Sequence, residues 1–316
     1  MNIAAKVGSD DVAVVYVGQY DDGELVEFVE AVQPPMPREE KWVLMLSTLY
    51  GCPVSCKMCD AGGFYHGKIS KERLFNQLDY LVYRHYPDGK IPCRQFKIQF
   101  ARMGEPSFNR EVLRVLEELP ERYDAPGLMP SLSTIAPGGV DRFFDDLLEI
   151  KNRYYSRGNF QFQFSLHTSD EKLRRELIPV RSWSFSEMQA YGERFYQPGD
   201  RKITLNFALA QDIPVLAEDL IRYFDPEKFL IKITPLNPTY SAENYGLRSY
   251  IDVEAGVQSY DVVDDLEAAG YRVIVSIGET EENRIGSNCG QYVLKHVLAE
   301  SKLGDGYLYK IEHMVE

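Results

Sequence analysis

Three cysteines in one short segment have the spacing that most directly indicates chemistry in this 316-residue chain. They occur in the run Gly51-Cys52-Pro53-Val54-Ser55-Cys56-Lys57-Met58-Cys59, which has the pattern C-x3-C-x2-C. Three thiolates on a loop that also carries glycine and proline can surround one soft metal centre. We therefore expect Cys52, Cys56 and Cys59 to bind a metal.

Two kinds of metal centre are compatible with this spacing. A 4Fe–4S cluster held by three thiolates keeps one iron without a protein ligand, and that iron can bind the amino and carboxylate groups of a small molecule. Structural zinc normally takes four closed ligands, commonly from paired C-x2-C elements, and the sequence holds no second such pair. Zinc would need Cys93 as a fourth ligand and would make the chain a non-catalytic binding protein. A third reading is three unconnected buried thiols.

Further polar residues are predicted at or just after the ends of strands. Gly104 and Glu105 stand in the run Met-Gly-Glu-Pro after a strand, and a carboxylate beside a glycine suits capture of an ammonium group. Hydroxyl, imidazole and amide groups at other strand ends could reach a ribose or an adenine. These candidate binding residues are Ser133, Ser165, Leu166, His167 and Asn237.

Cys289 is the remaining candidate for a reactive group. It stands in Asn288-Cys289-Gly290-Gln291, at the start of a predicted helix over 289–301. The positive end of a helix dipole favours the thiolate and so makes a cysteine nucleophilic. The alternative is a buried cysteine without a chemical role.

The elements that would position these residues alternate between strands and helices, which favours parallel βαβ units. The expected strands are Trp42–Ser47, Phe96–Phe100, Leu128–Ser133, Phe160–Leu166, Ile203–Leu209, Phe229–Thr234 and Arg272–Ser276. The expected helices are one from Ser70 to Pro87 and others over Arg110–Leu119, Val140–Asn152, Phe185–Phe195, Val215–Phe224, Val253–Ala269 and Cys289–Ser301. In (β/α) barrels the chemistry lies at the carboxyl ends of the strands.

The fold class that follows is α/β, a partial (β/α)6-type TIM barrel with an N-terminal β-hairpin extension. Residues 1–40 are expected to form the hairpin, from Val12–Val17 and Glu24–Val32, and a linker rich in proline. Residues 41–302 form the barrel core, and residues 303–316 an appended tail.

Composition limits the class of protein. Apolar runs are far shorter than the ~20 residues of a membrane helix, and the N-terminus has no secretory signal pattern. Five cysteines, three of them crowded together, favour a reducing cytoplasm over a disulfide framework. The formal charge of −13 disfavours a nucleic-acid partner, since such proteins usually carry a basic excess. Lys172, Arg174, Arg175 and Arg181 could form a local basic patch or a solvated helix face.

Taken in order, these motifs resemble the radical S-adenosylmethionine (SAM) superfamily. Within it they are similar to the RlmN/Cfr family, which C-methylates adenine in 23S ribosomal RNA and transfer RNA. The similarity runs from about residue 24 to 292. It comprises the cysteine loop, Met-Gly-Glu-Pro with a following Asn, Ser-Thr, Ser-Leu-His with Leu-Arg-Arg-Glu-Leu-Ile-Pro, Pro-Leu-Asn-Pro and Cys-Gly-Gln.

The resemblance implies a role for each candidate residue. Cys52, Cys56 and Cys59 would bind a 4Fe–4S cluster whose open iron chelates SAM, with an electron from a flavodoxin or ferredoxin cleaving the sulfonium. Cys289 would take a methyl group from one SAM and pass it to the substrate. Contacts to SAM would come from Gly104, Glu105, Ser133, Ser165, Leu166, His167 and Asn237. Glu30 falls near the family's proton acceptor, or is simply an exposed hairpin carboxylate.

Two departures from the family pattern bear on activity. Seven residues before Cys52, where the family has a second cysteine that resolves the enzyme–RNA adduct, stands Met45. A thioether cannot form the required disulfide. The family's helical RNA-binding domain is also not found before the hairpin. These departures favour an alternative, an oxidoreductase or mutase that uses SAM on a peptide or small metabolite without methyl transfer.

Overall fold

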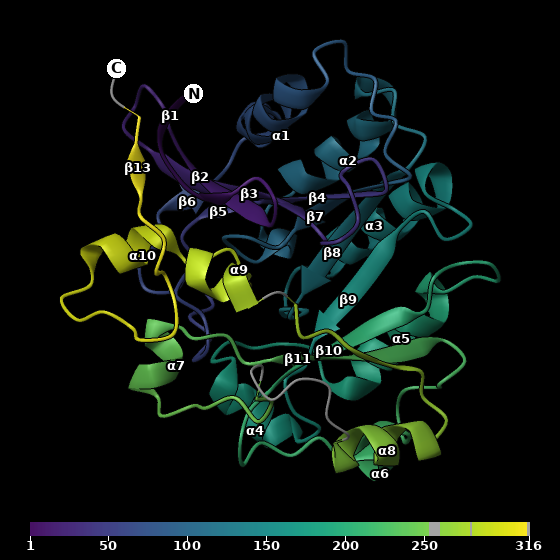
Figure 1. Ribbon diagram of the computed structural model, residues 1–316. Helices are drawn as coiled ribbons and strands as arrows, with labels where there is room; N and C mark the ends of the chain where they lie inside the picture. Colours follow the sequence, from purple (N-terminus) through teal and green to yellow (C-terminus); the bar gives the residue numbers. More distant parts are fainter. Residues whose placement is uncertain (253–259, 279, 315–316) are drawn as a thin grey trace.

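One large sheet organises the computed structural model, which describes residues 1–252, 260–278 and 280–314 (Figure 1). Within these residues it has eleven strands in the order β12-β11-β10-β9-β8-β7-β4-β3-β2-β1-β13. The parallel part comprises β4 (Lys41–Leu46), β7 (Gln95–Phe100), β8 (Leu128–Thr134), β9 (Gln161–Ser165), β10 (Ile203–Leu209), β11 (Phe229–Pro235) and β12 (Val273–Val275). Because β12 and β13 are edges that do not pair, the sheet is open. The expected α/β class and parallel sheet are confirmed, but the barrel is not.

The N-terminal strands continue this sheet instead of forming a separate hairpin. They are β1 (Asn2–Ser9), β2 (Ala13–Gln19) and β3 (Leu25–Val32), all antiparallel, and the C-terminal β13 (Glu312–His313) adds to β1. β3 pairs with β4 so that Val29 lies opposite Met45. The segment expected as an appended tail therefore contributes a strand to the main sheet.

Most helices cover one face of the sheet, which we call the outer face. They are α1 (Lys71–His85), α2 (Glu111–Arg122), α3 (Asp141–Tyr154), α5 (Phe185–Phe195), α6 (Ala217–Leu220) and α8 (Asp261–Ala268). The C-terminal segment with α9 (Thr280–Ile285) and α10 (Val293–Leu298), yellow in Figure 1, lies on the other side of the sheet from α1 and α2. The remaining short elements are β5 (Leu49–Tyr50), β6 (Gly67–Lys68), the 3-10 helix η1 (Pro106–Phe108), α4 (Glu171–Leu177) and α7 (Tyr240–Asn244).

The two faces of the parallel sheet differ in chemistry. On β7, Phe96, Ile98 and Phe100 are fully buried against the outer helices, whereas the alternate residues, among them Lys97, remain partly exposed. The same alternation holds on β9 and β11. The inner face is therefore polar and reached by solvent, unlike the apolar interior of a closed barrel.

The expected helices that differ from the structure do so for local reasons. The helix expected over 215–224 shortens to α6, whose N-cap Leu216 has no side chain that can accept a hydrogen bond. The helix expected from Cys289 begins at Val293, because Gly290 has φ of +85° and cannot belong to a right-handed helix. Of the helix expected over 253–269, residues 253–259 lie outside the described residues. Within the described residues, no helix is long and apolar enough to cross a membrane.

Candidate active site

The cysteine loop follows β4 and lies between β5 and β6, at the carboxyl end of the parallel strands. Burial raises the pKa of the Cys52, Cys56 and Cys59 thiols. The charge of Cys52 further raises the pKa of Cys56, and the charges of Cys56 and Cys52 further raise that of Cys59. Mutual repulsion of this kind means that the three sulfurs lie within electrostatic range of one another. The structure thus gathers the three predicted ligands into one group.

Three thiols on one loop are the ligand set of a 4Fe–4S cluster that keeps one iron open. Among the described residues, no three His, Cys, Asp or Glu side chains converge closely enough to hold one metal ion. A 4Fe–4S cluster binds each cysteine through a different iron, so its ligands stand further apart than those of mononuclear zinc. Cys93 does not join the group, since it is buried before β7 with its sulfur 3.5 Å from the Tyr86 hydroxyl.

Cys289 lies against this loop, in a segment that we call the Cys289 loop, residues 286–290. The Asp60 amide donates to the Gly290 carbonyl at 2.9 Å, directly after Cys59. A side chain at Gly290 would stand 3.0 Å from the Met58 carbonyl, so glycine allows the close approach. Cys289 itself is exposed to solvent.

The chemical environment of Cys289 differs from the one expected. It precedes α10 by four residues, so the helix dipole does not act on it as predicted. Loss of hydration next to the surrounding protein atoms raises the pKa of the Cys289 thiol. The positive charges of Lys232 and Arg102 oppose that rise. Two cations, and not a helix terminus, are therefore what favours the thiolate.

Every carbonyl of the Cys289 loop has a hydrogen-bond donor. The Arg102 guanidinium donates to the carbonyls of residues 286, 287 and 288 at 2.9, 3.1 and 3.2 Å. Asn237 Nδ2 donates to the Cys289 carbonyl at 3.0 Å. With the Asp60 amide on Gly290, five consecutive carbonyls are bound by three residues that are far apart in the sequence.

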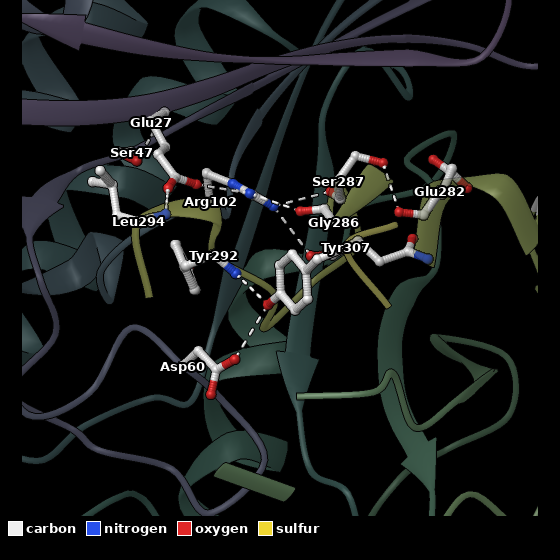
Figure 2. A network of polar contacts seen from close by, with 11 residues as sticks. Glu27, Ser47, Asp60, Arg102, Glu282, Gly286, Ser287, Tyr292, Leu294 and Tyr307 are labelled. Atoms are coloured by element: carbon white, nitrogen blue, oxygen red, sulfur yellow. Dashed lines mark hydrogen bonds and ion pairs between the residues drawn. The ribbon is translucent and has the colours of Figure 1, made fainter. Parts of the chain in front are cut away.

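Arg102 in turn is held by Glu27 of β3 (Figure 2). The two side chains form a fully buried ion pair at 2.8 Å, and the second Glu27 oxygen accepts from the Leu294 amide at 2.7 Å. The guanidinium also lies 4.9 Å from the centre of the Tyr292 ring. Charge neutralisation by Glu27 is what allows an arginine to be buried here.

Asp60 links the cysteine loop to the C-terminal segment. One carboxylate oxygen accepts from the Tyr240 amide and from the Tyr307 hydroxyl, at 3.1 and 3.2 Å, and the other accepts from Ser241. The Tyr307 hydroxyl accepts from the Tyr292 amide at 2.7 Å (Figure 2). Through Tyr307, the segment after residue 302 is therefore hydrogen-bonded to the cysteine loop.

Glu30 does not lie with these residues, which corrects the role expected for it. Its carboxylate is buried on the outer face, where it accepts from the Tyr16 hydroxyl at 2.6 Å and contacts His85 of α1 at 2.8 Å. Successive residues of a strand point to opposite faces, so Glu27 reaches the inner face and Glu30 the outer one. Glu30 is neither the exposed hairpin carboxylate nor a neighbour of the cysteines.

Met45 occupies the inner face of β4, opposite Val29, and packs with the apolar side chains beneath α9 and α10. Cys93, the only other thiol, is at the amino end of β7, whereas the cysteine loop is at the carboxyl end of β4. The six residues of β7 alone span roughly 20 Å. Cys93 therefore cannot act in place of the absent second cysteine.

Gly104 and Glu105 stand at the carboxyl end of β7, as expected. A side chain at Gly104 would collide with Leu49, and its φ is +98°, so this position requires glycine. Glu105 is buried and accepts from the Ser107 amide and hydroxyl, the Thr134 hydroxyl and the Ile135 amide. Its burial raises its pKa despite these donors. Three of these hydrogen bonds go to Oε1 and one to Oε2, so Oε2 keeps an acceptor position for an ammonium group.

The other predicted binding residues lie at the carboxyl ends of β8, β9 and β11. Ser133 accepts a hydrogen bond from Gln163 at 3.1 Å, Leu166 is buried, and Asn237 holds the Cys289 loop. The Ser165 carbonyl accepts from Arg174. Arg174 is itself buried, with further bonds to the Ile135 and Trp183 carbonyls, so it does not belong to the surface basic patch considered above.

His167 stays neutral at physiological pH. Burial, assisted by the charge of Arg174, lowers its pKa to about 4, and its Nδ1 accepts from the Ala208 amide at 3.1 Å. The proton of the neutral ring is then on Nε2, which can donate to a ligand.

This pKa predicts an acid sensitivity. Because the pKa is lower in the folded state than in the unfolded state, His167 removes stability as the pH falls from about 6.5 towards 4. The test compares wild type with His167→Asn, because asparagine suits the positive φ of 65° at this position. Between pH 7 and pH 5.5, we expect the free energy of unfolding to fall by about 1 kcal/mol less in the variant than in wild type. Urea unfolding of anaerobic protein at both pH values measures this. An equal loss in both proteins would contradict the assignment.

A cavity of about 750 Å³ lies beside Asn237, which binds the Cys289 carbonyl. It is lined by the segment from Pro235 to Thr239 after β11 and by Leu303 and Leu308 of the C-terminal segment. The cavity gives a small molecule room beside the residue that binds the Cys289 carbonyl.

Several residues of the site were not recognised in the sequence. Arg102 stands directly before Met-Gly-Glu-Pro, and this position beside a recognised motif was the available signal. Glu27 is 75 residues away from it, and Asp60 follows the last cysteine. Their partners depend on long-range pairing that no local pattern reveals.

Comparison with known proteins confirms the predicted resemblance. The chain is 26% identical over 297 residues to "Probable dual-specificity RNA methyltransferase RlmN" of Thermus thermophilus, covering 91% of this chain and 76% of that protein. It is 26% identical to the protein of the same name from Streptomyces griseus, covering 89% and 74%. No protein-family model matches the chain.

A solved structure supports the fold. The crystal structure of a radical SAM methyltransferase from Sphaerobacter thermophilus superposes with a TM-score of 0.68 at 19% identity, over 92% of this chain and 80% of that one. The shared fold and the similarity to methyltransferases together favour an enzyme over a non-catalytic binding protein.

Proposed function

From this similarity to RNA methyltransferases, we propose that the chain is a radical SAM methyltransferase with Cys289 as its methyl carrier. The substrate is a heteroaromatic ring, with an adenine of RNA as the substrate that the relatives' name suggests. The observation that most supports the proposal is the contact between the Cys289 loop and the cysteine loop, through Asp60 and Gly290. That contact brings the carrier to the group of three thiols.

Three residues would hold the iron–sulfur cluster, namely Cys52, Cys56 and Cys59. When bound, a 4Fe–4S cluster supplies the electron that cleaves the sulfonium of SAM, with a flavodoxin or ferredoxin as its source. Gly104 allows the backbone before Glu105 to pack against Leu49, and Glu105 would offer its carboxylate to the ammonium group. His167 offers the Nε2 proton of a neutral ring, and Ser133, Ser165 and Leu166 line the neighbouring strand ends.

Cys289 would act as a nucleophile towards the methyl group of SAM. As the thiol loses its proton, a bond forms between its sulfur and the methyl carbon, and the bond to the sulfonium breaks, which releases S-adenosylhomocysteine. The charges of Lys232 and Arg102 favour the thiolate that this step requires. The bound carbonyls of the Cys289 loop hold the sulfur in one place for attack.

A second candidate function is hydrogen abstraction from a peptide or small metabolite without methyl transfer. Met45 favours it, because its thioether cannot resolve a covalent adduct with the substrate and Cys93 is at the other end of the sheet. This candidate keeps the cluster and SAM and gives Cys289 no carrier role.

Product analysis separates the two candidates. We expect anaerobic protein with SAM and reductant to release both S-adenosylhomocysteine and 5′-deoxyadenosine, and Cys289→Ser to release no S-adenosylhomocysteine. Cys93→Ser, which changes a thiol outside the site, serves as the matched control. Release of 5′-deoxyadenosine alone by the wild type would support the second candidate. Digests of ribosomal and transfer RNA added to the reaction then show whether adenine is methylated.

A further inference from the structure

Three lysines lie on the inner face of the parallel sheet. Lys41 on β4, Lys97 on β7 and Lys232 on β11 occupy inward positions, each beside buried outward neighbours such as Ile98 and Ile231. β4 and β7 are adjacent, with Lys41 opposite Gln95, so Lys41 and Lys97 are diagonal neighbours. We call these residues the inner lysine group.

The ammonium groups of this set are close enough to repel one another. The charges of Lys232, Lys41 and Arg201 act on Lys97, and the charge of Lys41 acts on Lys232, although three strands lie between β7 and β11 in the sheet. Burial is the larger cause, and together these effects lower the pKa of Lys97 to about 7. The curved sheet therefore concentrates positive charge on its inner face.

The charge of this group is not balanced by ion pairs among the described residues. In residues 1–252, 260–278 and 280–314, the side chains of Lys97 and Lys232 form no ion pair and no hydrogen bond, and the Lys41 side chain donates to the neutral Gln33 side chain. The negative charge of Glu282 raises the pKa of Lys41 and Lys232. It is not among the charges that shift the pKa of Lys97. Half-buried charges of one sign reduce stability, so their retention needs a compensating use.

We propose that the inner lysine group is the binding site for an oxyanion, a phosphate or carboxylate group of a small substrate. Ammonium groups bind such anions through charge-assisted hydrogen bonds. The three positive charges of the inner lysine group outnumber the single negative charge of the nearby Glu282. The neighbouring inward side chains are also polar and supply further donors; they are Gln95, Gln99, Gln163 and Asn206.

The position of the site relative to Cys289 gives it a role in the reaction. Lys232 is the cation that most lowers the pKa of Cys289, so the group extends to the carrier thiol. A substrate held by its anion at Lys97 and Lys232 would therefore lie near Cys289, because the charge of Lys232 acts on both Lys97 and Cys289. This assignment to the substrate rests on the proposed function, whereas binding of the anion does not.

Competitive labelling of amines measures anion binding without SAM or turnover. Anaerobically reconstituted protein is treated with dilute acetic anhydride, and modification of Lys97 and Lys232 is followed by peptide mass spectrometry. We expect inorganic phosphate at ten times its dissociation constant to slow both reactions about tenfold, with ionic strength held constant by chloride. The exposed Lys172 is the internal control and should not change.

A parallel titration with succinate identifies the source of the oxyanion. Stronger protection by phosphate assigns a phosphorylated substrate, and stronger protection by succinate assigns a carboxylic acid. Failure of both anions to protect beyond chloride at equal ionic strength would overturn the proposal.

Substitution tests whether the lysines act together. Lys97→Met should abolish the protection of Lys232 by the better anion, and Lys228→Met, which changes a surface lysine paired with Glu193, should not. The melting temperature of Lys97→Met should equal or exceed that of wild type, because the substitution removes repulsion, and this reports that the fold is intact. Unchanged protection of Lys232 in folded Lys97→Met would contradict the proposal. Methylation of Cys289 is measured separately, so a failed methyl transfer leaves the result on anion binding intact.

Discussion

Replacing Cys56 with alanine is expected to abolish SAM cleavage. Cys56 is one of three protein ligands in the proposed cluster, and burial together with the charges of Cys52 and Cys289 places it inside the group of thiols. With only two ligands left, a cubane cluster is no longer anchored. We expect the purified variant to lose the brown colour and the iron, and 5′-deoxyadenosine to fall to background.

Cys93→Ala provides the control for this prediction. Cys93 is buried, whereas the three proposed cluster ligands are partly exposed, and its thiol contacts Tyr86 at the amino end of β7. We expect it to retain the iron content and the 5′-deoxyadenosine yield of wild type. A Cys56→Ala protein that keeps four irons, or a Cys93→Ala protein that loses them, would show that the ligands are wrongly assigned.

Replacing Arg102 with methionine is expected to have the largest effect on stability. It leaves Glu27 buried without its cation and removes the donors of three carbonyls in the Cys289 loop. Breaking a buried ion pair by removal of one partner costs about 3–5 kcal/mol. Denaturant unfolding of anaerobic protein measures this loss, and the double variant Glu27→Gln with Arg102→Met should lose less than the two single variants added together.

Arg102→Met also tests whether Arg102 positions Cys289. In the folded fraction with full iron content, we expect methylation of Cys289 to fall at least tenfold while 5′-deoxyadenosine is still formed. Arg102→Lys keeps the charge opposite Glu27 but has fewer hydrogen-bond donors. It should therefore restore a larger share of the lost stability than of the lost methylation of Cys289. Wild-type methylation in folded Arg102→Met protein would show that the arginine supports the fold alone.

Much of the parallel sheet was predictable from local sequence. The strand Ile203–Leu209 is mostly apolar, includes the β-branched and aromatic residues Ile203, Thr204 and Phe207, and has the same predicted and observed range. The helix Phe185–Phe195 was also predicted with its observed bounds, and in the structure a capping box of Ser184 and Glu187 fixes its start. The open sheet was not predictable, since closure depends on the curvature of all strands together.

The candidate site was predictable only where its residues are adjacent in the chain. Cys52, Cys56 and Cys59 share one loop, so their spacing revealed them. Glu30 was singled out from the family resemblance, and Glu27 was not considered. The face on which each of them lies depends on the pairing of β3 with β4, which the sequence does not show. A difference of three residues reverses the face of a strand.

The inner lysines show a signal that was present in the sequence and not used. Gln95-Phe96-Lys97-Ile98-Gln99-Phe100 alternates polar and apolar residues, although a strand of a parallel sheet with both faces covered is apolar throughout. The alternation along this strand is by itself enough to indicate that the inner face of the sheet is solvated.

Methylation of Cys289 is the most direct test of the central claim. Anaerobic protein is incubated with SAM that carries a trideuterated methyl group, and the peptide containing Cys289 is examined by mass spectrometry. We predict that one trideuteromethyl group is found on Cys289, together with an equal amount of S-adenosylhomocysteine. An unmodified Cys289 in protein that holds its iron and releases 5′-deoxyadenosine would contradict its role as the methyl carrier.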